Sequence, residues 1–293
     1  MLIRILVALL ILGSLAIAYG VFVERRWYRV GRYRLDILPA GTSELSVLHL
    51  SDLHLLDGDL RASRFLETLP RPDVAVVTGD IVGEPEAVEF AARALRPVRG
   101  RVASLFVLGS NDFYAPRPVN WFRYFRPRRR HVRAHVRAPH RHGRAGDLVR
   151  LLESDGWVHL KNRKYERLTN GLRMEVVGLD DPHIHRADIR VAARTDSGAF
   201  GLAVVHSPDP APELASLGYD LIVSGHTHGG QVRLPLMGAL VTNSSFPNRL
   251  ASGLMRFGES YVHVSPGLGT SKYAPFRFLC RPEATLLELR AVS

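Results

Sequence analysis

The sequence predicts an α/β fold, and two features of the chain support this prediction. Short apolar, strand-like runs alternate with helix-like stretches between residues 45 and 108. Several of these runs end directly in aspartate or histidine. In α/β proteins, ligands collect at the carboxyl edge of the sheet. We therefore expect the polar strand ends to form one common site.

The composition limits the possible classes of protein. A chain of 293 residues allows one large or two ordinary domains, and 46% hydrophobic residues are ample for a buried core. The single Cys280 excludes an intramolecular disulfide and a cysteine zinc cluster.

The N-terminus predicts a membrane anchor over residues 1–24. Residues 5–23 carry no charged side chain, enough for about 28 Å of helix at roughly 1.5 Å per residue. A cleaved secretory signal is the alternative, but Glu24-Arg25-Arg26 stands where a small-residue cleavage site belongs. More arginines follow the run than precede it, so we expect a single-pass protein of the cell membrane with its bulk in the cytoplasm.

A linker or edge strand is expected over residues 25–44, and the first part of the main domain follows. Its predicted strands are 45–50, 74–77 and 103–108, separated by helix-like stretches at 60–69 and 86–95. Alternate residues of an extended segment face the same way, so residue pairs spaced i, i+2 can face one point. The polar residues that follow these strands are Asp52, His54, Asp80, Ser110, Asn111 and Asp112.

Residues 116–146 are predicted to form a basic insert. Between residues 116 and 150 there are 11 arginines and a single acid, Asp147. One interpretation is a solvated loop. The other is a basic surface that attracts anionic lipid headgroups or a phosphorylated substrate, with aromatic residues 121–125 suited to membrane contact. Nucleic acid could bind the same features, but no recognition motif supports that partner.

The second half of the chain continues the pattern. Residues 148–153 and 211–217 read as helices, 157–160 as a strand, and 165–168 with 173–177 as a hairpin around Asn170-Gly171. The strand at 201–205 ends in His206, and 221–223 leads to His226 and His228. We expect strands 261–264 and 284–289 in a second sheet, and a loop at 265–270 facing the site.

Seven side chains make up the candidate metal-binding set, and they offer oxygen and nitrogen but no thiolate. The absence of a thiolate disfavours a structural zinc site of the cysteine type. Seven such groups are more than one catalytic metal ion needs. The set suits two ions with a bridging carboxylate, and therefore phosphoester hydrolysis by a metal-generated hydroxide. The seven are Asp52, His54, Asp80, Asn111, His206, His226 and His228.

Taken together, these motifs resemble the calcineurin-like metallophosphoesterase family over roughly residues 45–290. The resemblance rests on Asp52-Leu-His54, Gly79-Asp80, Gly109-Ser-Asn-Asp112, His206 and Gly225-His-Thr-His228. The Gly-His-Thr-His-Gly-Gly-Gln form, with the anchor, is most similar to the membrane-associated branch, which includes phosphohydrolases of lipid-linked or nucleotide-sugar lipid precursors.

The resemblance implies a four-layer fold in which two mixed β-sheets pack face to face between flanking helices, with a metallophosphoesterase domain over residues 45–291. It also implies two divalent ions, drawn from Mn, Fe, Zn or Ni. One ion would be held by Asp52, His54 and His228, and the other by Asn111, His206 and His226, with Asp80 bridging the two.

One motif departs from the family pattern, which usually reads Gly-Asn-His-Asp or Gly-Asn-His-Glu. Without gaps, Ser110 takes the place of the ligand asparagine and Asn111 that of the acid histidine. A one-residue shift makes Asn111 the ligand, which we prefer because an amide oxygen is the better neutral ligand, and puts Asp112 in the histidine position. Asp80, Asn111 and Asp112 are thus the expected catalytic residues, with Asp112, a histidine of the insert or a good leaving group replacing the missing acid.

The leading hypothesis is a membrane-anchored, dinuclear-metal phosphohydrolase that cleaves a phosphoester or phosphodiester, on a lipid-linked or nucleotide-linked small molecule. A phosphatase or nuclease for soluble substrates is the second hypothesis. A catalytically impaired metal-binding scaffold protein is the third, because the acid histidine is missing. The sequence does not predict the oligomeric state.

Overall fold

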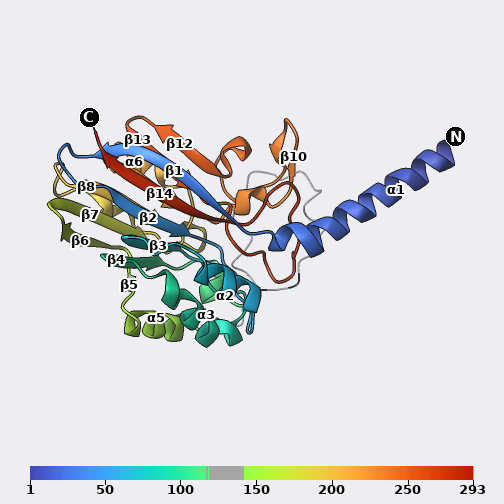
Figure 1. The fold of residues 1–293 in the computed structure, drawn as a ribbon, viewed down its shortest axis with the longest axis horizontal. Coiled ribbons are helices and arrows are strands. Elements are labelled where there is room, and N and C mark those ends of the chain that lie inside the picture. The colour runs from blue at the N-terminus through green and yellow to red at the C-terminus, as the bar shows by residue number, and fades with distance from the viewer. Residues whose placement is uncertain (117, 119–141, 293) are drawn as a thin grey trace.

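The computed structural model describes residues 1–116, 118 and 142–292. Two six-stranded mixed sheets pack face to face (Figure 1). In spatial order, the first contains β1 (Arg29–Leu38), β14 (Glu283–Ala291), β2 (Leu45–Leu50), β3 (Val74–Thr78), β4 (Ala103–Val107) and β5 (Val158–His159). The second contains β12 (Gly253–Phe257), β13 (Ser260–Val264), β9 (Leu221–Ser224), β8 (Phe200–Val205), β7 (Leu172–Leu179) and β6 (Arg163–Thr169). A ribbon of β10 (Arg233–Leu234) and β11 (Gly238–Ala239) lies apart.

Helices cover the outer faces of the two sheets. The helices α2 (Leu60–Glu67), α3 (Val88–Leu95) and α5 (Ala145–Ser154) pack on the first sheet, and α6 (Ala211–Ser216) packs on the second. A short α4 (Ser110–Phe113) follows β4. The resulting order of helix, sheet, sheet and helix confirms the predicted four-layer α/β architecture.

Alternation along each strand explains the layers. In β3, Val74 and Val76 face the core between the sheets, whereas Ala75 and Val77 face the helices. In β8, Val204 faces the same inner core, and Val205 packs toward α6. Because both faces of these strands are buried, they read in the sequence as continuous apolar runs, as is typical of parallel strands covered on both sides.

The predicted hairpin is confirmed, and one strand assignment is wrong. Antiparallel β6 and β7 are joined by Asn170 and Gly171, both with positive φ (47° and 79°), as a tight two-residue hairpin turn requires. The strand predicted at 284–289, now β14, lies in the first sheet and not in the second. It pairs parallel with β1 and antiparallel with β2. Its apolar pattern predicts burial but not the partner, because strand pairing is set by contacts distant in sequence.

Most of the basic insert lies outside the described residues, including the aromatic cluster 121–125 and the histidines at 131, 135 and 140. At its C-terminal end, Arg144 pairs with Glu89 (2.6 Å) and Asp147 (2.7 Å). The last two residues assigned to the insert from the sequence, Ala145 and Gly146, belong to α5.

The N-terminal helix projects from the body of the molecule (Figure 1). It runs from Leu2 to Arg26 as α1 (Leu2–Ala18), a π-helical turn (Tyr19–Val23) and a 3₁₀ turn (Glu24–Arg26), with a mean hydropathy of 2.6 over its most apolar window. By length and composition this helix is able to cross a membrane.

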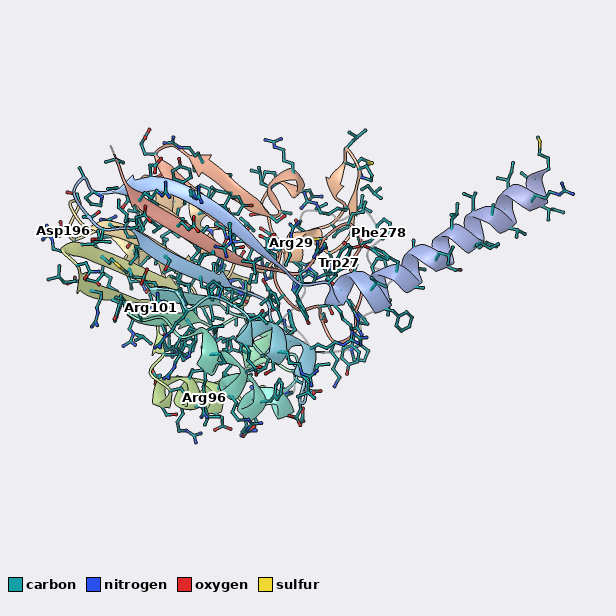
Figure 2. All side chains as sticks on the ribbon, viewed as in Figure 1. Trp27, Arg29, Arg96, Arg101, Asp196 and Phe278 are labelled. Carbon is teal, nitrogen blue, oxygen red and sulfur yellow. The ribbon has the colours of Figure 1, made fainter. Side chains whose placement is uncertain are left out.

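The base of the N-terminal helix is fixed to the loop 276–280, near the Trp27 and Phe278 labelled in Figure 2. The buried carboxylate of Glu24 accepts hydrogen bonds from the backbone N–H groups of Leu279 (2.9 Å) and Cys280 (2.6 Å). A Cβ on Gly20 would collide with the ring of Phe276, so the backbone of the helix packs directly against this side chain of the loop. The base of the helix is therefore docked on the body of the molecule, whereas α1 has no buried residue.

Arg277 connects this junction to the loop 265–270. Its guanidinium is fully buried and donates to the carbonyls of Pro266 (2.8 Å), Gly267 (3.1 Å) and Gly269 (2.7 Å). The N–H of Gly269 in turn donates to the carbonyl of Asp52 (2.6 Å). The predicted loop thus lies directly against the first metal-ligand motif.

A pair of buried histidines joins the two sheets. Nδ1 of His49 on β2 lies 2.8 Å from Nδ1 of His263 on β13, and Nε2 of His49 lies 2.9 Å from Oγ1 of Thr78. Burial lowers the pKa of His263 to about 3, and burial with the neighbouring ring lowers the pKa of His49 well below its ordinary value. Both rings are therefore neutral in the folded protein near neutral pH.

We expect these histidines to make the fold sensitive to acid. The unfolded chain takes up their protons near pH 6.5, whereas the folded chain resists protonation until a much lower pH. Their contribution to stability is thus complete above about pH 6.5 and is lost as the pH falls toward 3, by up to about 1.4 kcal/mol per pH unit for each imidazole. Chemical denaturation at pH 7, 6 and 5 should show a steeper loss for the wild type than for His263→Gln. Equal slopes would contradict this explanation.

Candidate metal centre

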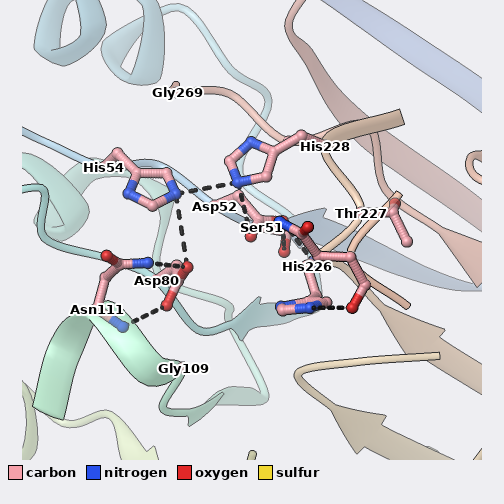
Figure 3. Close-up of polar contacts among 12 residues, drawn as sticks. Ser51, Asp52, His54, Asp80, Gly109, Asn111, His226, Thr227, His228 and Gly269 are labelled. Atoms are coloured by element: carbon pink, nitrogen blue, oxygen red, sulfur yellow. Dashed lines mark hydrogen bonds and ion pairs between the residues drawn. The ribbon is translucent and has the colours of Figure 1, made fainter. Parts of the chain in front are cut away.

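The structure brings all seven predicted ligands together at one edge of the sandwich (Figure 3). Each follows a strand that ends at this edge. Asp52 and His54 follow β2, Asp80 follows β3, and Asn111 lies on α4 after β4. From the second sheet, His206 follows β8, and His226 with His228 follows β9.

Five of these residues have a left-handed backbone conformation, which only glycine adopts readily. Such a conformation destabilises a non-glycine residue by about 1–3 kcal/mol, so its recurrence at one site indicates that the surrounding fold imposes it. The φ angles are 47° at Asp52, 43° at His54, 50° at Asp80, 69° at His226 and 51° at His228.

Two glycines make room for the carboxylates. A Cβ on Gly109 would lie within 2.5 Å of the His206 ring and would collide with Asp80 Oδ1. A Cβ on Gly225 would collide with Ser51 and with Asp52 Oδ2. Glycine is therefore required at positions 109 and 225, because the side chains of the site lie too close to the backbone there to leave room for a Cβ.

The first half of the site contains four donor atoms that converge. Nε2 of His54 lies 3.1 Å from Nε2 of His228 and 3.5 Å from Oδ2 of Asp80, and Nε2 of His228 lies 3.6 Å from Oδ1 of Asp52. Asp52 Oδ2 is held by Ser51 Oγ (2.7 Å) and the N–H of His226 (2.9 Å), whereas Oδ1 is buried without a hydrogen-bond partner among the described residues.

The second half is formed by His206 and His226. Nδ1 of His206 lies 2.7 Å from the carbonyl of Thr78, which can only accept, so Nδ1 carries the proton. Nε2 of His226 faces the carbonyl of Asn243 (3.4 Å) in the same way. The remaining nitrogens, His206 Nε2 and His226 Nδ1, then face the site, 3.1 Å apart.

Asp80 connects the two halves. Its Oδ2 is the oxygen near His54, and its Oδ1 lies 3.8 Å from Nε2 of His206. Asn111 donates to both of these oxygens, from its backbone N–H to Oδ1 (2.9 Å) and from its side-chain amide to Oδ2 (2.6 Å). Of Ser110 and Asn111, it is thus Asn111 whose side chain reaches this carboxylate.

The electrostatics of the site favour a bound cation. Burial lowers the pKa of His54, of His228 and of His226, the last to about 3, so these rings are neutral. Burial raises the pKa of Asp52 to about 7. Burial opposes protonation of His206 too, yet the carboxylates of Asp80, Asp181 and Asp52 raise its pKa to about 9. His206 therefore carries a second proton, on Nε2, near neutral pH, and the carboxylates draw positive charge to the position that this nitrogen faces.

Asp112 does not face the centre. Its Oδ1 accepts from the N–H groups of Ile81 (2.8 Å) and Val82 (3.1 Å), and its Oδ2 accepts from the N–H of Gly109 (2.9 Å). With both oxygens engaged in a fully buried position, the side chain fixes the loops that follow β3 and β4. This placement does not support the expected catalytic-acid role, and Asp112 is better described as a positioning residue.

Two further residues beside the site follow β7 and are absent from the predicted ligand set. Asp181 is fully buried, and its Oδ2 lies 4.0 Å from Nε2 of His206 with no hydrogen-bond partner among the described residues. The ring of His183 stacks on that of His226, with centroids 4.1 Å apart. Because β7 runs parallel to β8 and ends at the same edge, the rule of a strand followed by a ligand would have found both.

Asp209 orients His183. Nε2 of His183 lies 2.8 Å from Asp209 Oδ2 and 3.0 Å from Ser207 Oγ. Burial alone would raise the pKa of Asp209, but its hydrogen bonds with His183, Ser207 and Ser245 lower the pKa well below the ordinary value. The carboxylate therefore stays charged and holds this imidazole beside the second half of the site.

The residues fit divalent metal ions. Two pairs of imidazole nitrogens face each other at 3.1 Å, and buried carboxylate oxygens of Asp52 and Asp181 lack partners within the described part of the chain. Buried charges without partners are strongly destabilising, whereas carboxylates and neutral imidazoles are ordinary metal ligands. This donor set is therefore one that a divalent cation would satisfy.

Comparisons with known proteins agree with this geometry. The chain is 26% identical to the uncharacterized metallophosphoesterase YkuE of Bacillus subtilis (88% of this chain, 83% of the relative) and 27% identical to the phosphodiesterase YaeI of Escherichia coli (94% and 93%). It is 29% identical to the UDP-2,3-diacylglucosamine pyrophosphatase LpxG of Chlamydia trachomatis (83% and 83%). The family model of calcineurin-like phosphoesterases matches residues 45–230. The chain therefore belongs to the calcineurin-like phosphoesterase family of metal-dependent hydrolases.

Proposed function

We propose that the protein is a membrane-anchored phosphodiesterase whose site holds two divalent metal ions. The observation that carries this proposal is the division of Asp80, whose two oxygens each face one pair of imidazoles. Asp52, His54 and His228 would hold the first ion, and His206, His226 and Asn111 the second, with Asp80 shared. Asp181 is an additional candidate ligand on the second side.

Two divalent ions supply a Lewis acid for the phosphoryl oxygens and a water that loses its proton at neutral pH. The chain contributes the arrangement. Thr78 and Asn243 each engage one ring nitrogen of His206 and His226, so that the other nitrogen of each ring faces the site and would be the one to bind a metal ion. Ser51 holds one oxygen of Asp52 and leaves the other to a metal.

Protonation of the leaving group requires a residue other than Asp112. Among the described residues, His183 is the imidazole that lies beside the centre without being one of the expected ligands, and it is half-buried, so a substrate can reach it. Asp209 keeps the ring oriented. We therefore assign His183 the leaving-group contact that the family usually gives to the histidine missing from Gly109-Ser-Asn-Asp112.

The relatives and the N-terminal helix support a phosphodiester or pyrophosphate of an amphiphilic molecule as the substrate. YaeI is named a phosphodiesterase, and the name of LpxG specifies a diacylated, nucleotide-linked pyrophosphate. The helix would keep the site at the membrane surface, where such a molecule is concentrated. The metals proposed are Mn, Fe, Zn or Ni, because the ligands mix imidazole with carboxylate.

The purified protein should contain divalent metal and hydrolyse bis(p-nitrophenyl) phosphate. Asp80→Ala removes the shared carboxylate, so both ions lose a ligand. This variant should bind less metal, and its rate of hydrolysis should fall by at least about 100-fold. His226→Ala should lose one equivalent of metal and retain the other. Metal analysis and initial rates check both results.

Two matched controls accompany these variants. Asp196→Ala removes a carboxylate at the opposite end of the molecule (Figure 2), and His142→Ala removes an exposed imidazole outside the ligand set. Both should keep full metal content and activity. Bound metal without turnover on any phosphoester would return the protein to the scaffold hypothesis, and normal turnover of Asp80→Ala would refute the site.

Asp181→Asn should weaken binding of the second metal equivalent by about 10-fold or more, because the neutral amide keeps the shape but removes the unpartnered charge beside His206. Titration of metal-free protein followed by calorimetry measures the two binding steps separately. Identical affinities for the variant and the wild type at both steps would remove Asp181 from the ligand set.

A further inference from the structure

A cavity lies between the base of the N-terminal helix and the metal centre. Its volume is about 500 Å³, which suits a headgroup-sized molecule. Three segments distant in sequence line it: the end of the N-terminal helix at Arg25 and Arg26, the segment from Leu53 to Arg61, and the loop from Leu268 to Pro275. We call it the helix-base cavity.

The helix-base cavity reaches the metal centre through His54. This histidine belongs to the lining, and its Nε2 is one of the converging donor atoms of the first half of the site. A Cβ on Gly269 would lie 2.9 Å from the Cβ of His54, so the loop closes tightly over the ligand at this end. A molecule in the cavity would therefore touch the residue that supplies one of the candidate metal ligands.

The charges of the cavity favour an anion. Its lining contains four cationic side chains, Arg25, Arg26, Arg61 and Lys272, against the carboxylates of Asp57 and Asp59. Lys272 is paired with Glu84 (2.6 Å), and Asp59 accepts the N–H of Ala62 at the start of α2. Arg26 and Arg61 are exposed and make no ion pair or hydrogen bond with another described residue. Two guanidiniums thus remain available to a phosphate, which they bind well because of their planar fork of donors.

The cavity also has an apolar side that leads to the membrane. Leu53, Leu56, Leu268 and Pro275 belong to its lining. The helix that ends in Arg25 and Arg26 is exposed and apolar along its length. Because Glu24 ties the end of this helix to the loop 276–280, the cavity stays at the point where the helix leaves the body of the molecule.

We propose that the helix-base cavity binds the phosphorylated headgroup of a lipid, with Arg26 and Arg61 on its anionic group and its acyl chain directed along the N-terminal helix. The inference rests on the proposed function and deepens it, since it names the substrate as an anionic phospholipid-type molecule taken from the same membrane. The cavity thereby presents the headgroup to the metal centre through His54.

Three probes of matched chemistry test this assignment. Decanoyl lysophosphatidic acid has a phosphate and a chain, glycerol 3-phosphate has the phosphate alone, and decanoyl lysophosphatidylcholine has the chain with a zwitterionic headgroup. Each is titrated into the full-length metal-loaded protein in a nonionic detergent by calorimetry, and each is assayed as an inhibitor of bis(p-nitrophenyl) phosphate hydrolysis. Lysophosphatidic acid should bind at least about 10-fold more tightly than either of the others.

Arg61→Ala and Arg26→Ala should each weaken binding of lysophosphatidic acid by about 10-fold or more, as expected for the loss of a charge-assisted phosphate contact. Arg64→Ala is the matched control, because Arg64 is exposed on the same helix α2 as Arg61 but does not line the cavity. It should bind all three probes like the wild type.

Equal binding of glycerol 3-phosphate and lysophosphatidic acid would show a site for soluble phosphates and would overturn the lipid assignment. Equal binding of the two lysolipids would overturn the role of the arginines, as would wild-type affinity in Arg61→Ala and Arg26→Ala. Calorimetry does not depend on turnover. A protein that binds lysophosphatidic acid selectively but hydrolyses no ester would refute the proposed function and leave the cavity assignment standing.

Discussion

A dense cluster of buried imidazoles and carboxylates at one sheet edge is the central constraint of this structure. His54 faces His228, His206 faces His226, and Asp80 lies between the two pairs. Such a set is costly to assemble in a dry interior, because burial takes these polar and charged groups out of water. The rest of the fold holds it in place through strained left-handed residues at five ligand positions, glycines that allow close contact, and two sheets that end at one edge.

The protein contains two sets of buried histidines, one between the two sheets and one at the candidate metal site, and their surroundings give them different roles. His49 and His263 share a hydrogen bond between the sheets, and His49 also contacts Thr78, so their nitrogens are largely used within the protein. His206 uses one nitrogen on a carbonyl and presents the other to carboxylates. His206 is as fully buried as His49 and His263, so burial alone does not identify a metal ligand. The two sets differ in whether a ring nitrogen faces the carboxylates of the candidate metal site or a structural hydrogen-bond partner.

Local sequence patterns predicted most of the fold and of the site, because the information needed was local. An apolar run followed by aspartate or histidine was enough to place Asp52, Asp80, His206 and His226 at the edge of a sheet. The same rule applied to β7 would have identified Asp181 and His183.

The failures concern properties that depend on distant contacts. Nothing within residues 284–289 specifies that β14 enters the first sheet between β1 and β2. The orientation of Asp112 depends on the free N–H groups of Ile81 and Val82, which belong to another loop. The helix-base cavity is lined by three segments from opposite ends of the chain, so no window of sequence contains it.

The docking of Glu24 on the loop 276–280 has a practical consequence for work with this protein. A shortened chain that begins after Tyr28, made to improve solubility, would leave the amides of Leu279 and Cys280 without their carboxylate partner. The same loop supports Arg277, and through it the backbone of Gly267 and Gly269 against Asp52 and His54. Truncation would therefore perturb the candidate metal centre itself, because the base of the hydrophobic helix is part of the packing that supports it.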